Sequence, residues 1–327
     1  MAFQLLCTQG FHRVNNAHRP KTIMSYNAHL VTFVQFCEYI GTQYDCVSPQ
    51  VLLAFIEFLV LNGLSHGSVL NYLSSLKQSF KMYNKNVIAF EHEWVRLALK
   101  NVARTVTAPM KVKGVFTIQQ IKDIIDKCDS IPNGIVFKAL FLTALFGFLR
   151  LSNLVPCSLS TFDILKHLAR GDAFFSTTHV TLIIKWSKTL QNPNQHATVQ
   201  LPVLDNSPFC PAKALTHMYS ALPAGKNSPM FVVPQGQSYI TLTQSKVRKM
   251  LKNIILSLGL SPQLYPFHTF RRSGASLAFS QSTPVQDIQQ QGTWSSDAVW
   301  AYIIQDPSRP NQVTSTFRNL FASTQLI

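Results

Sequence analysis

The sequence predicts a mainly α-helical protein of two domains, with a small antiparallel three-stranded sheet in the second. Apolar residues recur at steps of three and four through residues 1–105, which is typical of packed amphipathic helices. Residues 106–115 contain Pro, Gly and two lysines without a period, as expected of a linker. Residues 116–327 combine long apolar segments with short alternating ones. A chain of 327 residues is long enough for two separate hydrophobic cores.

The first domain should be a small bundle of helices. Gly41 marks the end of the first helix, Ser48-Pro49 opens the second, and Asn62-Gly63 closes it. The predicted helices cover residues 26–37, 49–61, 69–83 and 93–104. The charge of this bundle is considered below.

The second domain should open with a capped helix, because Gln120 follows Thr117 at the spacing of a capping box. Residues 137–148 are almost continuously apolar and too many for one strand, so they predict a buried central helix. The three strands are expected around 161–165, 179–186 and 197–201, and later helices near 211, over 241–258, 268–279 and 285–291.

The charge of the chain points to a polyanionic partner. The 29 Lys and Arg residues exceed the 14 Asp and Glu residues, giving a net charge of +15, and the excess is present in both predicted domains. Lys77, Lys81 and Lys85 form a basic row on one predicted helix, and Lys111 and Lys113 lie in the linker. Such a row is usually only a solvated face, but in a chain of this charge we expect these five lysines to contact the phosphates of a polyanion.

Several classes of protein are excluded. The apolar stretches 51–61 and 139–149 are shorter than the roughly 20 residues that a membrane helix needs, and no signal-peptide pattern is present. The six cysteines form no CxxC pair, so we expect a reduced, intracellular protein without structural zinc. Paired carboxylates for metal binding, HExxH, a phosphate-binding glycine loop and GxSxG are absent. No metal or cofactor is expected.

A few residues remain that could carry chemistry. Arg150 follows the apolar run that ends at Leu149, where a charge is tolerated only if it is paired or faces a ligand. His268 and Arg271 are three residues apart and share one helix face. Tyr302 follows a glycine turn at Gly292 by ten residues.

In this order the segments resemble the conserved boxes of the tyrosine recombinase (phage integrase) family. Gly147-Phe-Leu-Arg-Leu-Ser-Asn-Leu154 resembles the first box, His268-x-x-Arg271 the second, and the turn leading to Tyr302 the third. The wording His-Thr-Phe-Arg-Arg-Ser-Gly and Gly-Thr-Trp-Ser-Ser-Asp is most similar to recombinases of eukaryotic mobile elements of the DIRS and Crypton kinds. The resemblance covers essentially the whole chain and implies a core-binding domain followed by a catalytic domain.

The resemblance implies site-specific cutting and rejoining of double-stranded DNA without metal or ATP. Tyr302 would be the nucleophile, forming a 3′-phosphotyrosyl bond of similar energy to the bond that it breaks. Arg150 and Arg271 would hold the two non-bridging oxygens, and His268 would act as general base and acid. A family lysine on the hairpin between the second and third strands protonates the leaving oxygen. Lys188 is our candidate for that lysine, with Lys185 as the alternative.

Three positions depart from the family pattern or stay open. Asn153 stands where the family often has an acidic residue. The sixth catalytic position directly follows the glycine and would be Thr293, but Trp294, one residue later, is the better donor through its indole N–H. Arg272 lies next to Arg271, and we expect it to contact phosphate or to serve the structure rather than to catalyse.

The family further implies a homotetramer on paired DNA sites that exchanges C-terminal helices, and the segment 311–327 is our candidate for the exchanged helix. A eukaryotic host would place the protein in the nucleus. Two other functions fit the same fold: strand relaxation like that of a type IB topoisomerase, and DNA binding by a domesticated protein without catalytic activity.

Overall fold

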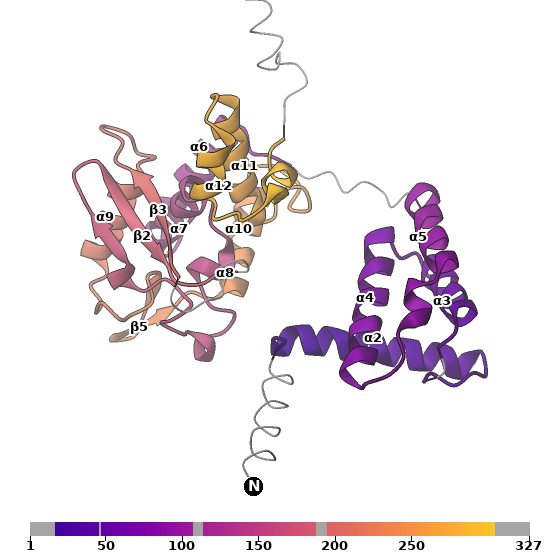
Figure 1. The fold of residues 1–327 in the computed structure, drawn as a ribbon. Coiled ribbons are helices and arrows are strands. Elements are labelled where there is room, and N and C mark those ends of the chain that lie inside the picture. The colour runs from indigo at the N-terminus through magenta and orange to yellow at the C-terminus, as the bar shows by residue number, and fades with distance from the viewer. Residues whose placement is uncertain (1–16, 46, 107–113, 188–194, 305–327) are drawn as a thin grey trace, which may run out of the picture. The chain divides into compact units, whose positions relative to one another are not determined.

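The computed structural model describes residues 17–45, 47–106, 114–187 and 195–304 (Figure 1). The chain divides into two compact units, Met1–Lys111 and Val112–Ile327. Each unit is described by itself, because each has a separate apolar core. The predicted fold class is confirmed: the protein is mainly helical and has a small three-stranded antiparallel sheet in the second unit.

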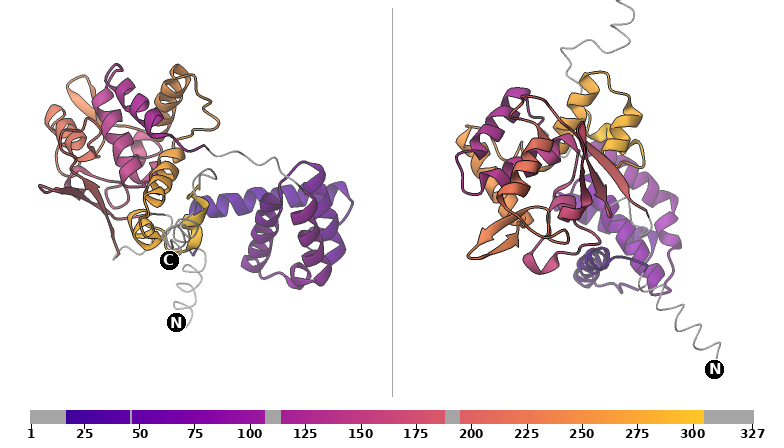
Figure 2. Two further views of the ribbon diagram at one scale, coloured as in Figure 1. Left: turned by 90° about the horizontal axis from the view of Figure 1, so that it is seen from above. Right: turned by 90° about the vertical axis from the view of Figure 1, so that its left-hand side faces the viewer.

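The described part of the first unit is a helical bundle in which the longest helix, α2, crosses the others rather than running alongside them (Figures 1 and 2). Phe33, fully buried on α2, packs edge-on against Phe55 at 5.0 Å between ring centroids. Ser48 accepts a hydrogen bond from the Val51 N–H, which confirms it as the N-cap of α3. The helices are α2 (Pro20–Tyr39), α3 (Pro49–Leu61), α4 (His66–Met82) and α5 (Glu93–Thr105).

The second unit is built on a sheet of strand order β1-β2-β3, in which both pairs are antiparallel. The strands are β1 (Ala173–Phe175), β2 (His179–Ile184) and β3 (Ala197–Pro202), and a separate hairpin is formed by β4 (Val232–Gln235) and β5 (Ser238–Thr241). The longer helices are α6 (Ile118–Cys128), α7 (Gly134–Phe146), α9 (Pro211–Ala221), α10 (Gln244–Ser257), α11 (His268–Ser280) and α12 (Val285–Gln291). The capping box of Thr117 with Gln120 at the start of α6 is confirmed.

The prediction of a strand at 161–165 is wrong. Residues 159–161 form a turn of 3-10 helix, and the Asp163 carboxylate accepts a hydrogen bond from the Leu165 N–H, so local side-chain bonds hold this segment as turns. The first strand is instead β1, which pairs with β2. The hairpin of β4 and β5 was not expected, because Pro234 within β4 and Gly236 in the turn weaken the strand pattern.

Helix α7 positions the site. Apart from Lys138, which pairs with Asp129, it presents apolar side chains on nearly all sides, and it is covered by α6, α9, α11 and β3. Helix α11 approaches its C-terminal end very closely at Gly274, where a Cβ would lie 2.3 Å from the Leu145 carbonyl oxygen. Only glycine permits this approach, and it places the start of α11 beside the residues that follow α7.

Candidate active site

The segment after α7 is strained and presents Arg150. Phe148 has a φ of 47°, a left-handed conformation that is costly for a bulky residue and persists where the surroundings enforce it. Arg150 is the N-cap residue of a short helix, α8 (Leu151–Leu154). The side-chain oxygen of Asn153 accepts the Arg150 N–H at 3.2 Å. The Asn153 side chain thus holds the turn between α7 and α8 in place.

Helix α11 begins at His268 and brings Arg271 under the same turn. Arg271 is fully buried, and its Nη1 donates to the carbonyl oxygen of Phe148. On its other side the guanidinium carbon lies 3.7 Å from the centre of the indole ring of Trp294. The strained carbonyl and the indole together hold the guanidinium in one orientation.

The donors around Arg271, which belong to Arg150, Arg271 and Trp294 and are called the cradle here, are arranged to meet an anion. Burial, together with the nearby charge of Arg150, lowers the pKa of Arg271 to about 9, because its charged form is desolvated and repelled. Within the described residues, the buried Nη1 of Arg150, Nε and Nη2 of Arg271 and Nε1 of Trp294 have no hydrogen-bond partner. Unsatisfied buried donors are rare, and three of these four belong to the two guanidinium groups. A phosphate-sized anion would satisfy them.

Tyr302 lies at the edge of this cradle. It follows a 3-10 helix, η4 (Asp297–Ala301), and its backbone carbonyl accepts a hydrogen bond from Ser276 on α11 at 3.1 Å. Its ring lies 5.1 Å from the ring of His268 and 5.0 Å from that of Trp294. The Arg271 guanidinium carbon is 5.2 Å from the same ring. The structure therefore gathers Arg150, His268, Arg271, Trp294 and Tyr302 in one place.

The local backbone explains how Trp294 enters the site. Thr293 has a φ of 54°, so the chain turns sharply after Gly292. The indole of Trp294 folds back over Gly292, where a Cβ would lie 1.8 Å from the ring. The one-residue shift from the family spacing is thus accommodated by a left-handed threonine and a glycine, and it is Trp294 that packs on Arg271.

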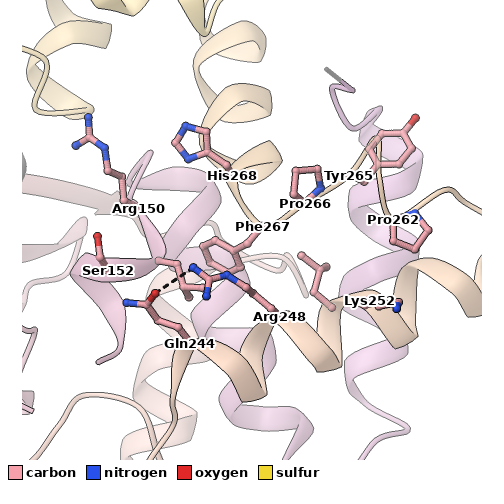
Figure 3. A pocket seen from close by; sticks show the side chains of 12 residues that line it. Arg150, Ser152, Gln244, Arg248, Lys252, Pro262, Tyr265, Pro266, Phe267 and His268 are labelled. Carbon is pink, nitrogen blue, oxygen red and sulfur yellow. Dashed lines mark hydrogen bonds between the residues drawn. The ribbon is translucent and has the colours of Figure 1, made fainter. Parts of the chain in front are cut away.

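A hollow of about 420 Å³ opens beside Arg150 and His268 (Figure 3). Its further wall is α10, which contributes Arg248 and Lys252. Arg248 is held by Gln244, whose side-chain oxygen accepts its Nη2–H at 3.0 Å. These two cations were missed from the sequence, although the basic series Lys246, Arg248, Lys249 and Lys252 on one helix could have indicated them.

The lysine of the hairpin is not placed, since Lys188 lies outside the described residues. The alternative, Lys185, forms an ion pair with Asp172 at 2.6 Å, and both side chains are mostly covered. Asn153 donates a hydrogen bond to the carbonyl of Trp186 at 2.9 Å. The amide thus joins the Arg150 turn to the chain just before Lys188, which an acidic residue at this position could not do.

The residues predicted to bind DNA have different surroundings. Lys77 pairs with Glu91 at 2.8 Å, Lys85 lies 3.7 Å from Asp45, and Lys81 is exposed. Lys111 and Lys113 lie outside the described residues. Arg272 is buried and donates to the carbonyl of Gly114 at 2.8 Å, which gives it a structural contact.

Comparison with known proteins places the fold. The sequence profile of the phage integrase N-terminal SAM-like domain matches residues 12–85. The structure is similar to that of the Tn1549 transposon integrase in complex with circular intermediate DNA, with a TM-score of 0.65 and 15% identity, covering 97% of this chain and 98% of that one. The chain has the fold of these DNA integrases.

Two further solved structures agree. The XerH site-specific recombinase bound to its palindromic difH substrate gives a TM-score of 0.61 at 16% identity, covering 90% of this chain and 80% of that one. A lambda integrase dimer bound to a core site gives a TM-score of 0.59 at 14% identity, and the match covers 93% of this chain and 78% of that one. A search of curated protein sequences finds no match. The special similarity to DIRS and Crypton recombinases stays a prediction.

Membrane-spanning helices and metal-binding clusters were looked for among the described residues. No described helix is both long and apolar enough to cross a membrane. No group of three or more His, Cys, Asp or Glu side chains among these residues is arranged to hold a metal ion.

Proposed function

We propose that the protein is a site-specific DNA recombinase or integrase that cuts and rejoins double-stranded DNA through a covalent bond to Tyr302. One observation carries the proposal. A phenol and an imidazole lie beside two arginines and an indole, four of whose buried nitrogen atoms have no hydrogen-bond partner among the described residues. This is an anion site with a nucleophile at its edge.

In the proposed reaction the Tyr302 oxygen attacks a DNA phosphorus. The Tyr302 Oη–P bond forms, the bond from phosphorus to the 5′-oxygen breaks, and the energy of the diester is kept in the phosphotyrosyl bond. His268 takes the phenolic proton, since its ring lies against that of Tyr302. Lys188 supplies a proton to the leaving 5′-oxygen. The reverse steps rejoin the strand to the same or to another 5′-hydroxyl.

The cradle stabilises the transition state. Attack adds negative charge to the non-bridging oxygens, and Arg150, Arg271 and Trp294 offer donors that need no rearrangement to meet it. Removal of one such donor in other enzymes typically costs about 10²–10³-fold in rate. The Phe148 carbonyl and the Trp294 ring fix the Arg271 guanidinium in place before DNA arrives.

The partners follow from the same proposal. Residues 1–105 would be the core-binding domain, 106–115 the linker and 116–327 the catalytic domain, and both domains would bind the duplex through phosphates. Arg248 and Lys252 extend the positive wall from the cradle along α10 and suit a continuing DNA backbone. Four chains on two DNA sites, exchanging C-terminal helices, would carry out strand exchange. That exchange involves residues outside the described part of the chain.

The test uses nicked duplexes that lose a short strand on cleavage and so trap the covalent adduct, with EDTA present throughout. Wild-type protein should form an adduct that is stable to denaturant and sensitive to protease, and Tyr302→Phe should form none while binding the same DNA equally well. An adduct together with strand exchange between two duplexes supports a recombinase. Relaxation of supercoils without exchange favours a topoisomerase-like activity, and binding without any adduct favours a silent DNA-binding protein.

A further inference from the structure

Helix α11 has a second set of contacts, with the segment where the described chain enters the second unit. Arg272 donates to the Gly114 carbonyl at 2.8 Å, and the Phe116 N–H donates to the Ser273 hydroxyl at 2.8 Å. Arg272 is 6% exposed and Ser273 fully buried. The two residues directly after Arg271 therefore bind residues 114–116.

Aromatic packing strengthens this attachment. The ring of Phe116, 1% exposed, stacks on Tyr265 with centroids 5.1 Å apart and packs against Phe270 of α11 at 5.2 Å. At Gly114 a Cβ would lie 2.7 Å from the Tyr265 ring and 2.8 Å from the Leu264 carbonyl oxygen. The segment thus lies so close to the chain before α11 that one methyl group would displace it.

The same helix also holds the proposed nucleophile. The Ser276 hydroxyl donates to the Tyr302 carbonyl at 3.1 Å and accepts the Ile304 N–H at 3.0 Å. Within one turn and a half, α11 therefore binds residues 114–116, carries Arg271, and holds the backbone of the Tyr302 segment. A helix of this length moves as a rigid rod, so displacement of one contact displaces the others.

Arg272 suits such an attachment. Its guanidinium offers donors in a rigid planar fork, and burial lowers its pKa, so the chain accepts a desolvation cost at this position. A guanidinium on a carbonyl fixes the position of that carbonyl more narrowly than a flexible ammonium would. Residues 114–116 are joined covalently, through the preceding residues, to the first unit.

We infer that Arg272 and Ser273 are positioning residues, which join the segment 114–116 to the helix that carries Arg271 and holds Tyr302. DNA binding by the first unit would then act through the chain on the alignment of the catalytic groups. The inference rests on the proposed function for its effect on cleavage. Of the two roles expected for Arg272 from the sequence, a phosphate contact and a structural contact, it assigns the structural one.

The kinetic test compares single-turnover adduct formation by full-length variants at saturating DNA. Ser273→Ala removes the hydroxyl of α11 that accepts the Phe116 N–H. Gly114→Ala displaces the segment 114–116 and leaves the sequence of α11 unchanged. Ser280→Ala is the control, because the Ser280 hydroxyl donates to the Leu277 carbonyl of the same helix. Because misplacement of about 1 Å can cost about 10²-fold, we expect Ser273→Ala and Gly114→Ala to slow cleavage about tenfold or more. DNA affinity should stay within about twofold of wild type, and Ser280→Ala should behave as wild type.

Two results would overturn the inference. One is an unchanged cleavage rate in both Ser273→Ala and Gly114→Ala. The other is a loss that lies entirely in DNA affinity or in the folded fraction. Restoration of the rate by Ser273→Thr, which keeps the hydroxyl acceptor, supports it.

A second measurement does not depend on cleavage and uses Tyr302→Phe as background. Hydrogen exchange of the peptides that contain α11 and residues 292–304 should slow when DNA binds, and Ser273→Ala should remove most of that protection at equal DNA occupancy. Equal protection with and without the Ser273 hydroxyl would reject the coupling. If no variant forms an adduct, the proposed function fails, and hydrogen exchange still decides the coupling.

Discussion

At the scale of single residues, the site is a set of donors held ready for an anion. Arg271 is buried between the Phe148 carbonyl and the Trp294 indole, and Arg150 stands close enough for its charge to lower the Arg271 pKa. Two cations held this close, one of them fully buried, raise the free energy of the folded protein through desolvation and repulsion. Binding of a phosphate would offset this repulsion. The pair of Arg150 and Arg271, which destabilises the free protein, therefore favours phosphate binding.

Inorganic phosphate should therefore stabilise the protein against heat. At ten times its Kd it adds about 1.4 kcal/mol, or roughly 3 °C in Tm for a unit of this size. Well below pH 9 Arg271 is charged and can bind phosphate. As pH rises through about 9, Arg271 of the free folded protein loses its proton, and a neutral guanidine attracts phosphate less, so phosphate stabilisation falls. The stability of the protein without phosphate should change in the opposite sense, because the unfolded chain keeps this proton up to the ordinary arginine value. Thermal scans at several pH values, with Arg150→Gln as the variant expected to lose the effect, check this.

Asn153 offers a second test at this scale. Asn153→Asp keeps the acceptor for the Arg150 N–H but loses the hydrogen bond that the Asn153 amide donates to the Trp186 carbonyl. We expect a loss of about 1–3 kcal/mol in unfolding free energy. Adduct formation should slow as well, because the chain before Lys188 is freed. Denaturant titration checks the first effect, and Asn101→Asp on the exposed face of α5 is the matched control. Equal stability of both variants would contradict the account.

At the scale of elements, the position of α11 decides the geometry. Gly274 lets this helix touch the end of α7, where a Cβ would also lie 2.5 Å from the Phe148 ring. Without this approach Arg271 could not reach the Phe148 carbonyl. The close contact joins the first and second sequence boxes, 123 residues apart at the Arg271 to Phe148 hydrogen bond.

Gly274→Ala should therefore destabilise the protein by about 1–3 kcal/mol and slow adduct formation further than the loss of stability explains. Gly67 is a helical glycine of α4 with open space around its Cβ position. Gly67→Ala should leave stability unchanged or raise it by about 0.5–1 kcal/mol. Chemical denaturation of both variants checks the contrast, and similar values for the two would show that the approach at Gly274 is not tight.

The lysines of α4 make a separate prediction. Lys81 is exposed, whereas Lys77 is paired with Glu91. If α4 contacts phosphates, Lys81→Ala should reduce the slope of log affinity against log salt by about 1, and Lys77→Ala by less, because its partner already neutralises part of its charge. DNA-binding titrations at several salt concentrations check this. An unchanged slope in Lys81→Ala would remove α4 from the interface.

How far the sequence could predict these elements depends on how local their causes are. Ser48, Thr117 and Gln120 act on neighbouring backbone groups, and their caps are present as expected. The prediction of a strand near 161–165 was wrong because Asp163 and Ser158 form local hydrogen bonds that hold turns, which the pattern of hydrophobic residues does not reveal. The start of α2 at Pro20 was missed, since its first turns bury little and show no apolar period.

At the scale of the whole molecule, the sequence named five of the residues that the structure gathers, and it did so through their order along the chain. Their contacts could not be derived, because they depend on the left-handed Phe148 and Thr293 and on the close packing at Gly274. The wall formed by Arg248 and Lys252 was missed for the same reason, since it becomes part of the site only when α10 packs beside α8 and α11. Tertiary packing, not local pattern, builds this site.

The central claim is that Tyr302 is the residue that joins DNA. The most direct measurement is to form the adduct on a nicked duplex in EDTA, digest both protein and DNA, and find by mass spectrometry which side chain carries the remaining nucleotide. We expect a nucleotide 3′-phosphate on Tyr302, and no adduct from Tyr302→Phe under the same conditions. A nucleotide on any other residue, or an adduct that persists in Tyr302→Phe, would contradict it.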